Sequence, residues 1–462
     1  MIPRLSPSRL ARIVPFAIAA CLSTVALAQP KPAANKPAPK AAAAPAPAAG
    51  KARSPANDAQ EKAIAIVGAT VYTGDAEPIE NATVVIAGGK IKSVGKDVAA
   101  PAGAEIVQAK GMVVTPGLVE PLTQVGVREI DLEPSANDGS ATRSEDRIRA
   151  AYRAADAYNP ASSVIPVTRL GGITSVGVTP SGGLFSGQSA WADLAGETAS
   201  DAIVLAPLAQ HVHLDAGDDP QGGSRAAALR LVREAFDDAR TYQKNRAAFE
   251  KNQSRPFAAG RLDLDALTQS LGPAKKGSPK VPVVFHVDRA STILSVLAVA
   301  KEFDLTPVIA GGAEAWRVRK TLAKEKVPVI VYPLVTGPES FDSLGAREDN
   351  AALLFAAGVP VALSSGETQN ARKLRQAAGN AVRGGLPHTA AIAAVTRVPA
   401  EALGMSATHG TLSPGKTANL VLWSGDPLET TTRAVAVLIH GQKQPMTSRQ
   451  TQLLQKYRTV TR

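Results

Sequence analysis

Apolar runs of strand length alternate with amphipathic stretches through the middle of the chain. The stretch 224–252 has apolar residues at helical spacing, with charged residues between them. The strand-like runs are rich in Val and Ile, and they fall at 173–178, 281–286, 306–309, 327–331 and 359–363. Continuous apolar runs are typical of buried parallel strands, and amphipathic stretches of the helices that connect them. This alternation is what a barrel of the (β/α) type requires, and we expect an α/β fold, a (β/α)8 TIM-like barrel spanning 113–407.

Further strand-like runs, without helices between them, lie on both sides of the predicted barrel. They fall at 63–73, 82–86, 90–94 and 104–108 before it, and at 419–423 and 434–439 after it. The pair Gly88-Gly89 indicates a hairpin turn between two of these runs. We therefore expect a small composite β-sandwich domain formed by both ends of the chain, residues 61–112 and 408–442. The basic tail at 443–462 is expected to fray in solvent.

The first 28 residues have the pattern of an export signal. Three arginines flank the start of an apolar run at 13–25, which is too short to span a bilayer comfortably. Ala26-Leu27-Ala28 then fits the small-x-small rule for cleavage. We expect an exported protein, periplasmic or secreted. The alternative is a lipoprotein, because Ile18-Ala19-Ala20-Cys21 also resembles a lipobox that would anchor the chain through Cys21.

Residues 29–60 consist largely of Pro, Ala and Lys. Such a segment cannot bury enough apolar surface to offset the entropy of ordering, so it is expected to be an extended linker. A solvated tether is one interpretation of this linker. The other is contact with an acidic surface of the cell envelope through its lysines.

The formal net charge of +11 is concentrated at the two ends of the chain. Residues 1–57 contain eight basic and no acidic residues, and the residues after Glu429 contain six basic and no acidic residues. Subtracting these fourteen charges from +11 leaves −3 for 58–429. A near-neutral body gives no support to nucleic-acid binding, so the expected partner is a small molecule. The sequence does not determine the oligomeric state.

The stretch from Val113 to Gln124 reads V-V-T-P-G-L-V-E-P-L-T-Q, a Pro-Gly turn leading into a buried strand. It resembles the first barrel strand of the amidohydrolase superfamily, where V-x-P-G-L-I-D runs into H-x-H. Residues 410–423, G-T-L-S-P-G-K-T-A-N-L-V-L-W, are similar to the closing strand of that family. Together with 167–174 and the Gly-rich loop 181–190, these segments resemble an exported, imidazolonepropionase-like subgroup of the superfamily.

The resemblance implies hydrolysis of carbon–nitrogen bonds other than peptide bonds, by water bound to a divalent metal such as zinc. The family's ligands are the H-x-H pair, single histidines on the fifth and sixth strands, and an aspartate on the eighth. The resemblance places Leu122 and Gln124 at the H-x-H positions, Gly311 or its neighbour Ala310 on the sixth strand, and Gly366 on the eighth. None of these side chains is a good zinc ligand, so the residues themselves do not support a zinc cofactor.

His286, at the fifth-strand position, is retained and is a candidate catalytic residue. Three roles are open for it: a structural donor to Asp288 or Glu314, a substrate contact or general base, or a metal ligand. Glu367 is a second catalytic candidate, one residue after the lost aspartate position. In an extended segment its side chain would point to the opposite face, unless a local bulge turned it inward.

A relocated metal site is a further possibility, at His211-Val212-His213-Leu214-Asp215. If this stretch is extended, His211, His213 and Asp215 lie on one face, and two histidines with a carboxylate form a common metal site. The alternative is a polar strand end that pairs with nearby acids.

Two functions follow from these observations. The first is a cell-envelope hydrolase of carbon–nitrogen bonds that acts through an altered or relocated site. The second is a non-catalytic relative that binds a small ligand or a partner at the barrel mouth, the function favoured by the replaced ligands.

Overall fold

The computed structural model describes residues 62–140, 147–214, 224–272 and 280–458. The predicted export signal, its alternative lipid anchor at Cys21, the whole of the predicted linker and Asp215 lie outside these residues. Within the described residues, no helix is both long enough and apolar enough to cross a bilayer.

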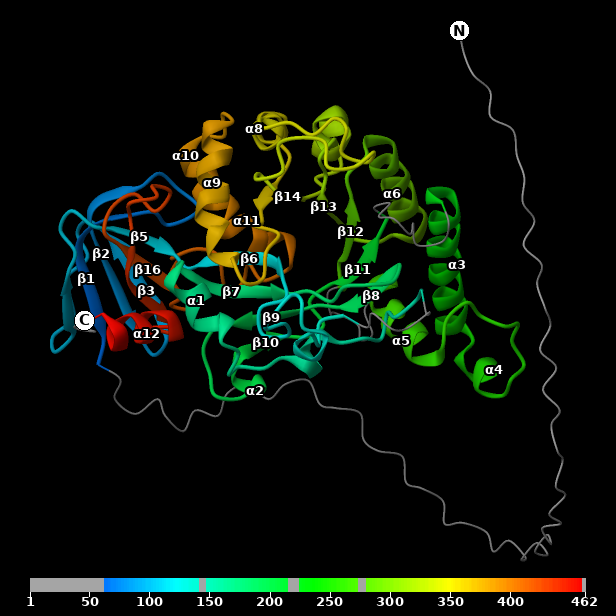
Figure 1. Cartoon of the computed structure of the whole chain (residues 1–462), viewed down its shortest axis with the longest axis horizontal. Helices are drawn as coiled ribbons and strands as arrows, with labels where there is room; N and C mark the ends of the chain where they lie inside the picture. Colours follow the sequence, from blue (N-terminus) through cyan, green and yellow to red (C-terminus); the bar gives the residue numbers. More distant parts are fainter. Residues whose placement is uncertain (1–61, 141–146, 215–223, 273–279, 459–462) are drawn as a thin grey trace, which may run out of the picture. The chain divides into compact units, whose positions relative to one another are not determined.

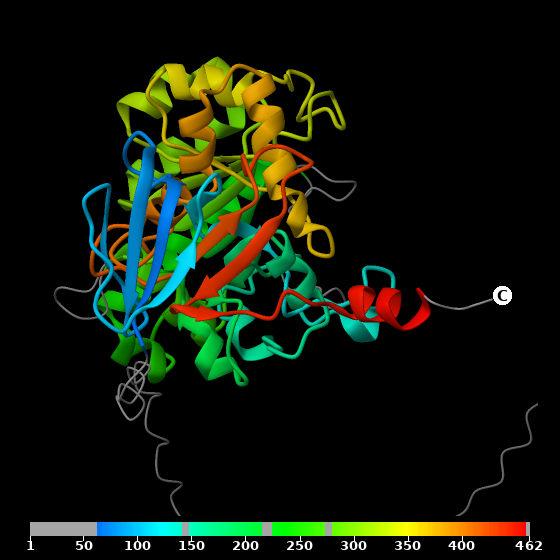
Figure 2. The same ribbon diagram turned by 90° about the vertical axis from the view of Figure 1, so that its left-hand side faces the viewer.

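One sheet combines strands from both ends of the described chain, which Figures 1 and 2 show as blue strands beside orange and red ones. Its order is β18-β17-β16-β5-β1-β2-β3, with β4 paired to β1. The strands are β1 (Ile64–Val71), β2 (Ile79–Ala87), β3 (Lys90–Gly95), β4 (Glu105–Gln108), β5 (Val113–Pro116), β16 (Leu420–Trp423), β17 (Ala434–Ile439) and β18 (Gln442–Lys443). The expected short strands are therefore present, and β16 pairs antiparallel with β5 to join the two ends.

The middle of the chain forms two further sheets. The first has the order β10-β9-β7-β6 and contains β6 (Leu118–Thr123), β7 (Ile173–Val178), β9 (Ala190–Asp193) and β10 (Ile203–Leu205). The second has the order β15-β14-β13-β12-β11-β8 and contains β8 (Phe185–Gln188), β11 (Gln210–His213), β12 (Val283–Val287), β13 (Pro307–Gly311), β14 (Val329–Val331) and β15 (Val361–Leu363). The predicted ring of eight parallel strands therefore does not appear as one continuous ladder in the described residues.

Side chains from both of these sheets pack into one apolar cluster. Val119 of β6, Trp191 of β9, Val284 of β12, Ile330 of β14 and Ala362 of β15 all belong to it and are buried. Since the facing strands of two sheets share this cluster, the sheets enclose a common interior.

Helices follow most of the parallel strands, as an α/β fold requires. They are α1 (Val164–Leu170), α2 (Ala199–Ala202), α3 (Arg225–Lys244), α4 (Arg246–Glu250), α5 (Arg261–Leu271), α6 (Ala290–Phe303), α7 (Arg319–Lys324), α8 (Asn350–Ala356), α9 (Leu374–Arg383), α10 (His388–Ala394) and α11 (Arg397–Ala402). The helix expected over 224–252 is interrupted at Asn245, which caps both α3 and α4.

The tail contains a helix, so the expectation that it only frays is wrong. α12 (Arg449–Tyr457) begins at Ser448, whose side chain accepts a hydrogen bond from the backbone N–H of Thr451. The Thr451 hydroxyl in turn receives a hydrogen bond from the Ser448 backbone, which completes a capping box. Figure 2 shows this red helix beside the C-terminus.

The Pro116-Gly117 turn carries the chain from β5 directly into β6. A Cβ atom at Gly117 would lie 2.0 Å from Thr174 Oγ1, so only glycine allows β6 to approach β7 at this point. This turn therefore positions the strand that bears Leu122 and Gln124.

Candidate functional site

A cavity of about 570 Å³, called here the central cavity, opens at the C-terminal ends of β6 and β12 and beside the loop after β15. Its lining includes three positions where the family resemblance places metal ligands, Leu122, Gln124 and Gly366, and three candidate catalytic or metal-binding residues, His213, His286 and Glu367. The structure therefore brings most of the residues singled out from the sequence to one place.

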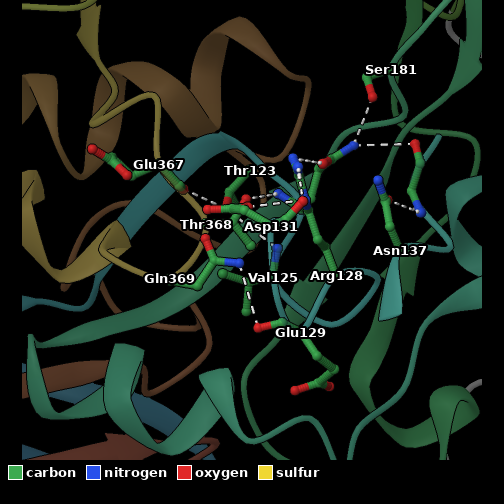
Figure 3. A network of polar contacts seen from close by, with 12 residues as sticks. Thr123, Val125, Arg128, Glu129, Asp131, Asn137, Ser181, Glu367, Thr368 and Gln369 are labelled. Carbon is green, nitrogen blue, oxygen red and sulfur yellow. Dashed lines mark hydrogen bonds and ion pairs between the residues drawn. The ribbon is translucent and has the colours of Figure 1, made fainter. Parts of the chain in front are cut away.

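Leu122 packs into the shared apolar cluster and is only 5% exposed. Gln124 is engaged in hydrogen bonds at both ends of its amide. Its Nε2 donates to the Gly139 carbonyl at 3.1 Å and to Ser181 Oγ at 3.0 Å, and its Oε1 accepts from Arg128 at 3.1 Å. Figure 3 shows this polar network around Arg128 and Ser181. Neither side chain presents a free ligand atom to the cavity.

Two glycines stand at positions where the family resemblance implies a ligand, and their backbone conformations disfavour a side chain. Gly311 has φ +88°, and a Cβ atom there would lie 2.6 Å from Asp288 Oδ1. Gly366 has φ +69°. Both angles fall in the left-handed region, which histidine and aspartate occupy only at a cost.

His286 has a different partner from the two acids expected. Its Nε2 lies 3.0 Å from His211 Nδ1, so one of these two nitrogens donates and the other accepts. Its ring stacks on His213 with centroids 4.0 Å apart and an interplanar angle of 9°. Asp288 instead accepts from the Ala313 backbone, and Glu314 from the backbones of Ala290 and Gly345.

The register between two strands explains why His286 contacts the other two histidines. β11 pairs in parallel with β12, and His213 lies directly opposite His286. The three imidazoles of His211, His213 and His286, called here the histidine cluster, therefore meet across two adjacent strands. His213 Nε2 also lies 3.1 Å from Ser186 Oγ.

All three histidines are held in the neutral form. Burial lowers the pKa of His211 to about 3 and that of His213 to about 4, with His213 and Arg149 respectively adding to the effect. Burial also holds the pKa of His286 well below its usual value, and the two other imidazoles lower it further. A neutral imidazole can accept a hydrogen bond, whereas a lowered pKa weakens it as a general base.

The donor set does not fit the divalent metal that the family resemblance implies. Leu122, Gly311 and Gly366 offer no ligand atom, and the amide of Gln124 is already hydrogen-bonded. No group of three His, Cys, Asp or Glu in the described residues has the geometry to hold a metal ion. For the relocated site, His211 and His213 are in place, whereas Asp215 lies outside the described residues.

Glu367 lines the central cavity, although the sequence placed its side chain on the opposite face. Its carboxylate lies 3.2 Å from Lys373 Nζ, and its backbone carbonyl accepts from Thr123 Oγ1 at 2.8 Å. The ion pair with Lys373 occupies one oxygen of the Glu367 carboxylate. A catalytic role for Glu367 remains a prediction.

Sequence reasoning missed Glu120, a fully buried carboxyl on β6. It accepts hydrogen bonds from the Ser364 hydroxyl, from the Ser365 hydroxyl at 2.6 Å and from the Ser365 backbone at 2.9 Å. Burial outweighs these bonds and raises the pKa of Glu120 to about 7. An acidic residue inside an otherwise apolar strand was the signal, and its role is to join β6 to the end of β15.

Asp193 was missed as well. It is fully buried at the end of β9, where its Oδ2 lies 3.2 Å from His409 Nε2 and 2.9 Å from His440 Nε2. Its Oδ1 accepts from Ser175 Oγ at 2.6 Å. Burial alone would raise the pKa of Asp193, but the charge and hydrogen bonds of the two histidines hold it far below its usual range. No local sequence pattern connects these residues.

Comparison with known proteins gives the family of the chain. The model of the amidohydrolase family matches residues 145–443. Among solved structures, an amidohydrolase from Thermotoga maritima MSB8 is 27% identical with a TM-score of 0.73, over 82% of this chain and 99% of that one. Molinate hydrolase is 17% identical with a TM-score of 0.52, over 83% of this chain and 95% of that one, a likeness of fold alone.

A curated relative, the amidohydrolase tasK of Hapsidospora irregularis, is 24% identical over 373 residues. The match covers 74% of this chain and 37% of the relative. The chain therefore spans little more than a third of the length of that protein.

Proposed function

We propose, from the premise that this chain belongs to the amidohydrolase family, that its central cavity binds a small molecule without metal-dependent hydrolysis. The two central sheets would then correspond to the barrel of the family, with the cavity at its mouth. The proposal extends to an exported protein of the cell envelope, since the first 28 residues have the pattern of a signal peptide. The basic linker would keep the protein near acidic envelope surfaces.

One observation carries the proposal. At the strand where the family resemblance calls for H-x-H, Leu122 is part of the apolar cluster and both ends of the Gln124 amide are hydrogen-bonded. A metal there would lack donors on one side and would face a leucine on the other. The cavity itself remains, at about 570 Å³, a volume typical of small-molecule sites.

The chemistry of the lining favours a polar ligand. Arg128 contributes a guanidinium that also pairs with Asp131 and donates to Gln124. His213 and His286 contribute neutral imidazoles that donate or accept. Apolar contacts come from Leu122, and from Leu334 beyond the end of β14. Such a site combines a few orienting polar groups with apolar walls.

A second candidate is hydrolysis of a carbon–nitrogen bond in the same cavity, with His286 as general base. The observation that favours it is that His286 and Glu367, the two catalytic candidates, both line the cavity. A hydrolase would need His286 to release its contact with His211 or to pass a proton through it.

Both candidates can be tested by incubating the purified protein with dipeptides, N-acyl amino acids and cyclic ureides, and by measuring hydrolysis and melting temperature. Each compound is tested once with added Zn²⁺ and once with EDTA. We expect no hydrolysis above the buffer rate in either case, and a rise in melting temperature with those compounds that bind. At a hundredfold excess of ligand over Kd, the stabilisation is about 2.7 kcal/mol.

The matched variants are Val335→Trp, which fills the cavity, and Val204→Trp on exposed β10. Only the first is expected to abolish the ligand-induced rise. Turnover that requires added metal, and that disappears in His286→Ala and Glu367→Ala, would establish the hydrolase instead.

A further inference from the structure

A second, smaller cavity lies beside α1 and shares no lining residue with the central cavity. Its walls come from α1, from the loop before α1 and from the segment between β9 and α2, elements labelled in Figure 1. We call it the α1 cavity. Its volume is about 170 Å³. One water molecule needs only about 10–15 Å³ on this measure, so the cavity has room for a small molecule.

Two hydrogen-bond donors in the wall of the α1 cavity have no acceptor. Tyr158 is only 5% exposed, and its hydroxyl is buried without a partner. Arg169 Nε is likewise buried without a partner, although the same guanidinium donates through Nη1 to the Leu194 carbonyl at 3.1 Å and to Gln444 Oε1 at 2.9 Å. An unsatisfied buried donor is costly, and two in one cavity indicate a missing acceptor.

The charge in this cavity is also uncompensated. Arg169 is the one charged residue in the lining, and the described residues provide it with no carboxylate partner. Asp193, whose charge acts on the Tyr158 hydroxyl, is not part of the lining, and its oxygens are engaged by His409, His440 and Ser175. Burial raises the pKa of Tyr158, as does the charge of Asp193, so its hydroxyl keeps its proton and remains a donor.

We propose that the α1 cavity binds a small oxyanion, a phosphate or the carboxylate of a small organic acid, between the Tyr158 hydroxyl and the Arg169 guanidinium. An oxyanion supplies several acceptors at once, and a hydrogen bond between ionised partners is stronger than a neutral one. The guanidinium fork matches the geometry of both phosphate and carboxylate. The Leu194 carbonyl and Gln444 Oε1 hold the guanidinium in place by accepting hydrogen bonds from its Nη1.

Equilibrium dialysis of the full chain against radiolabelled phosphate, at constant pH and ionic strength, tests the proposal. We expect saturable uptake of one phosphate per chain. Tyr158→Phe removes only the unpartnered hydroxyl and is expected to weaken binding about tenfold, the value of one charge-assisted hydrogen bond. Arg169→Gln is expected to weaken binding at least as much. Competition with acetate identifies the class, since displacement indicates a carboxylate site and resistance a phosphate site.

Tyr242→Phe is the matched control, because Tyr242 is equally buried but its hydroxyl donates to Asp265 at 3.0 Å. It is expected to lower the melting temperature and leave phosphate uptake unchanged. Tyr158→Phe, by contrast, is expected to melt no lower than the wild type. Unsaturable uptake, or uptake that Tyr158→Phe and Arg169→Gln leave unchanged, overturns the proposal and assigns the cavity to water.

Discussion

Replacement of Asp193 with alanine is expected to lower the free energy of unfolding by about 3–5 kcal/mol, the usual cost of removing one partner from a buried ion pair. The carboxylate is fully buried and joins His409 and His440, near the C-terminal strands, to the end of β9. Without it, both imidazoles and the Ser175 hydroxyl lose their acceptor inside the protein. Denaturant unfolding measures the difference.

Asp304→Asn is the matched control, because the Asp304 side chain is 92% exposed and pairs with Lys280 at the surface. A change within about 0.5 kcal/mol is expected there, since exposed pairs contribute little. Asp193→Asn keeps one acceptor oxygen and is expected to fall between the two. A loss at Asp193→Ala no greater than the control loss would show that the histidines find other partners.

Acidification is expected to destabilise the protein through the histidine cluster. The imidazoles of an unfolded chain take up protons below about pH 6.5, whereas His213 in the folded chain resists protonation to about pH 4. The unfolded state therefore binds more protons in this window, so stability is fully present above pH 6.5 and falls as the pH drops. For His213 alone, the loss by pH 4.5 is about 2–3 kcal/mol.

Glu120 has the opposite effect on how stability depends on pH. Its pKa of about 7 means that the folded chain carries this proton between pH 4.5 and 7, where the unfolded chain has lost it. Stability from Glu120 is thus gained as the pH falls. Urea unfolding at pH 7.5 and 4.5 should show a shallower loss for His213→Phe than for the wild type, and a steeper loss for Glu120→Gln. Equal losses in all three proteins would contradict the assignment of both groups.

Local pattern predicted many of the strands of the fold. The Val- and Ile-rich runs became β7, β12, β13, β14 and β15 because continuous apolar sequence is stable only when buried on both faces. The turn at Gly88-Gly89 and the strands around it also formed as expected. α12 was missed because its capping box stabilises a segment with few apolar residues.

The site was predictable only in part, because its contacts depend on how strands that are far apart in the sequence pair with one another. Leu122, Gln124 and His286 were found from the family pattern, and they do meet in one cavity. The contact of His286 with His211 depends on pairing of strands 75 residues apart, and that of Glu120 with Ser364 on residues 244 apart. No periodicity within either segment contains that information.

The central proposal is that the residues at the ligand positions implied by the family resemblance do not hold a metal in this protein. Metal analysis after incubation with excess Zn²⁺ and desalting tests it most directly. The account predicts about 0.1 equivalent or less per chain, because Leu122, Gln124, Gly311 and Gly366 supply no free ligand. One equivalent or more, lost when His211 and His213 are both replaced with alanine, would contradict it.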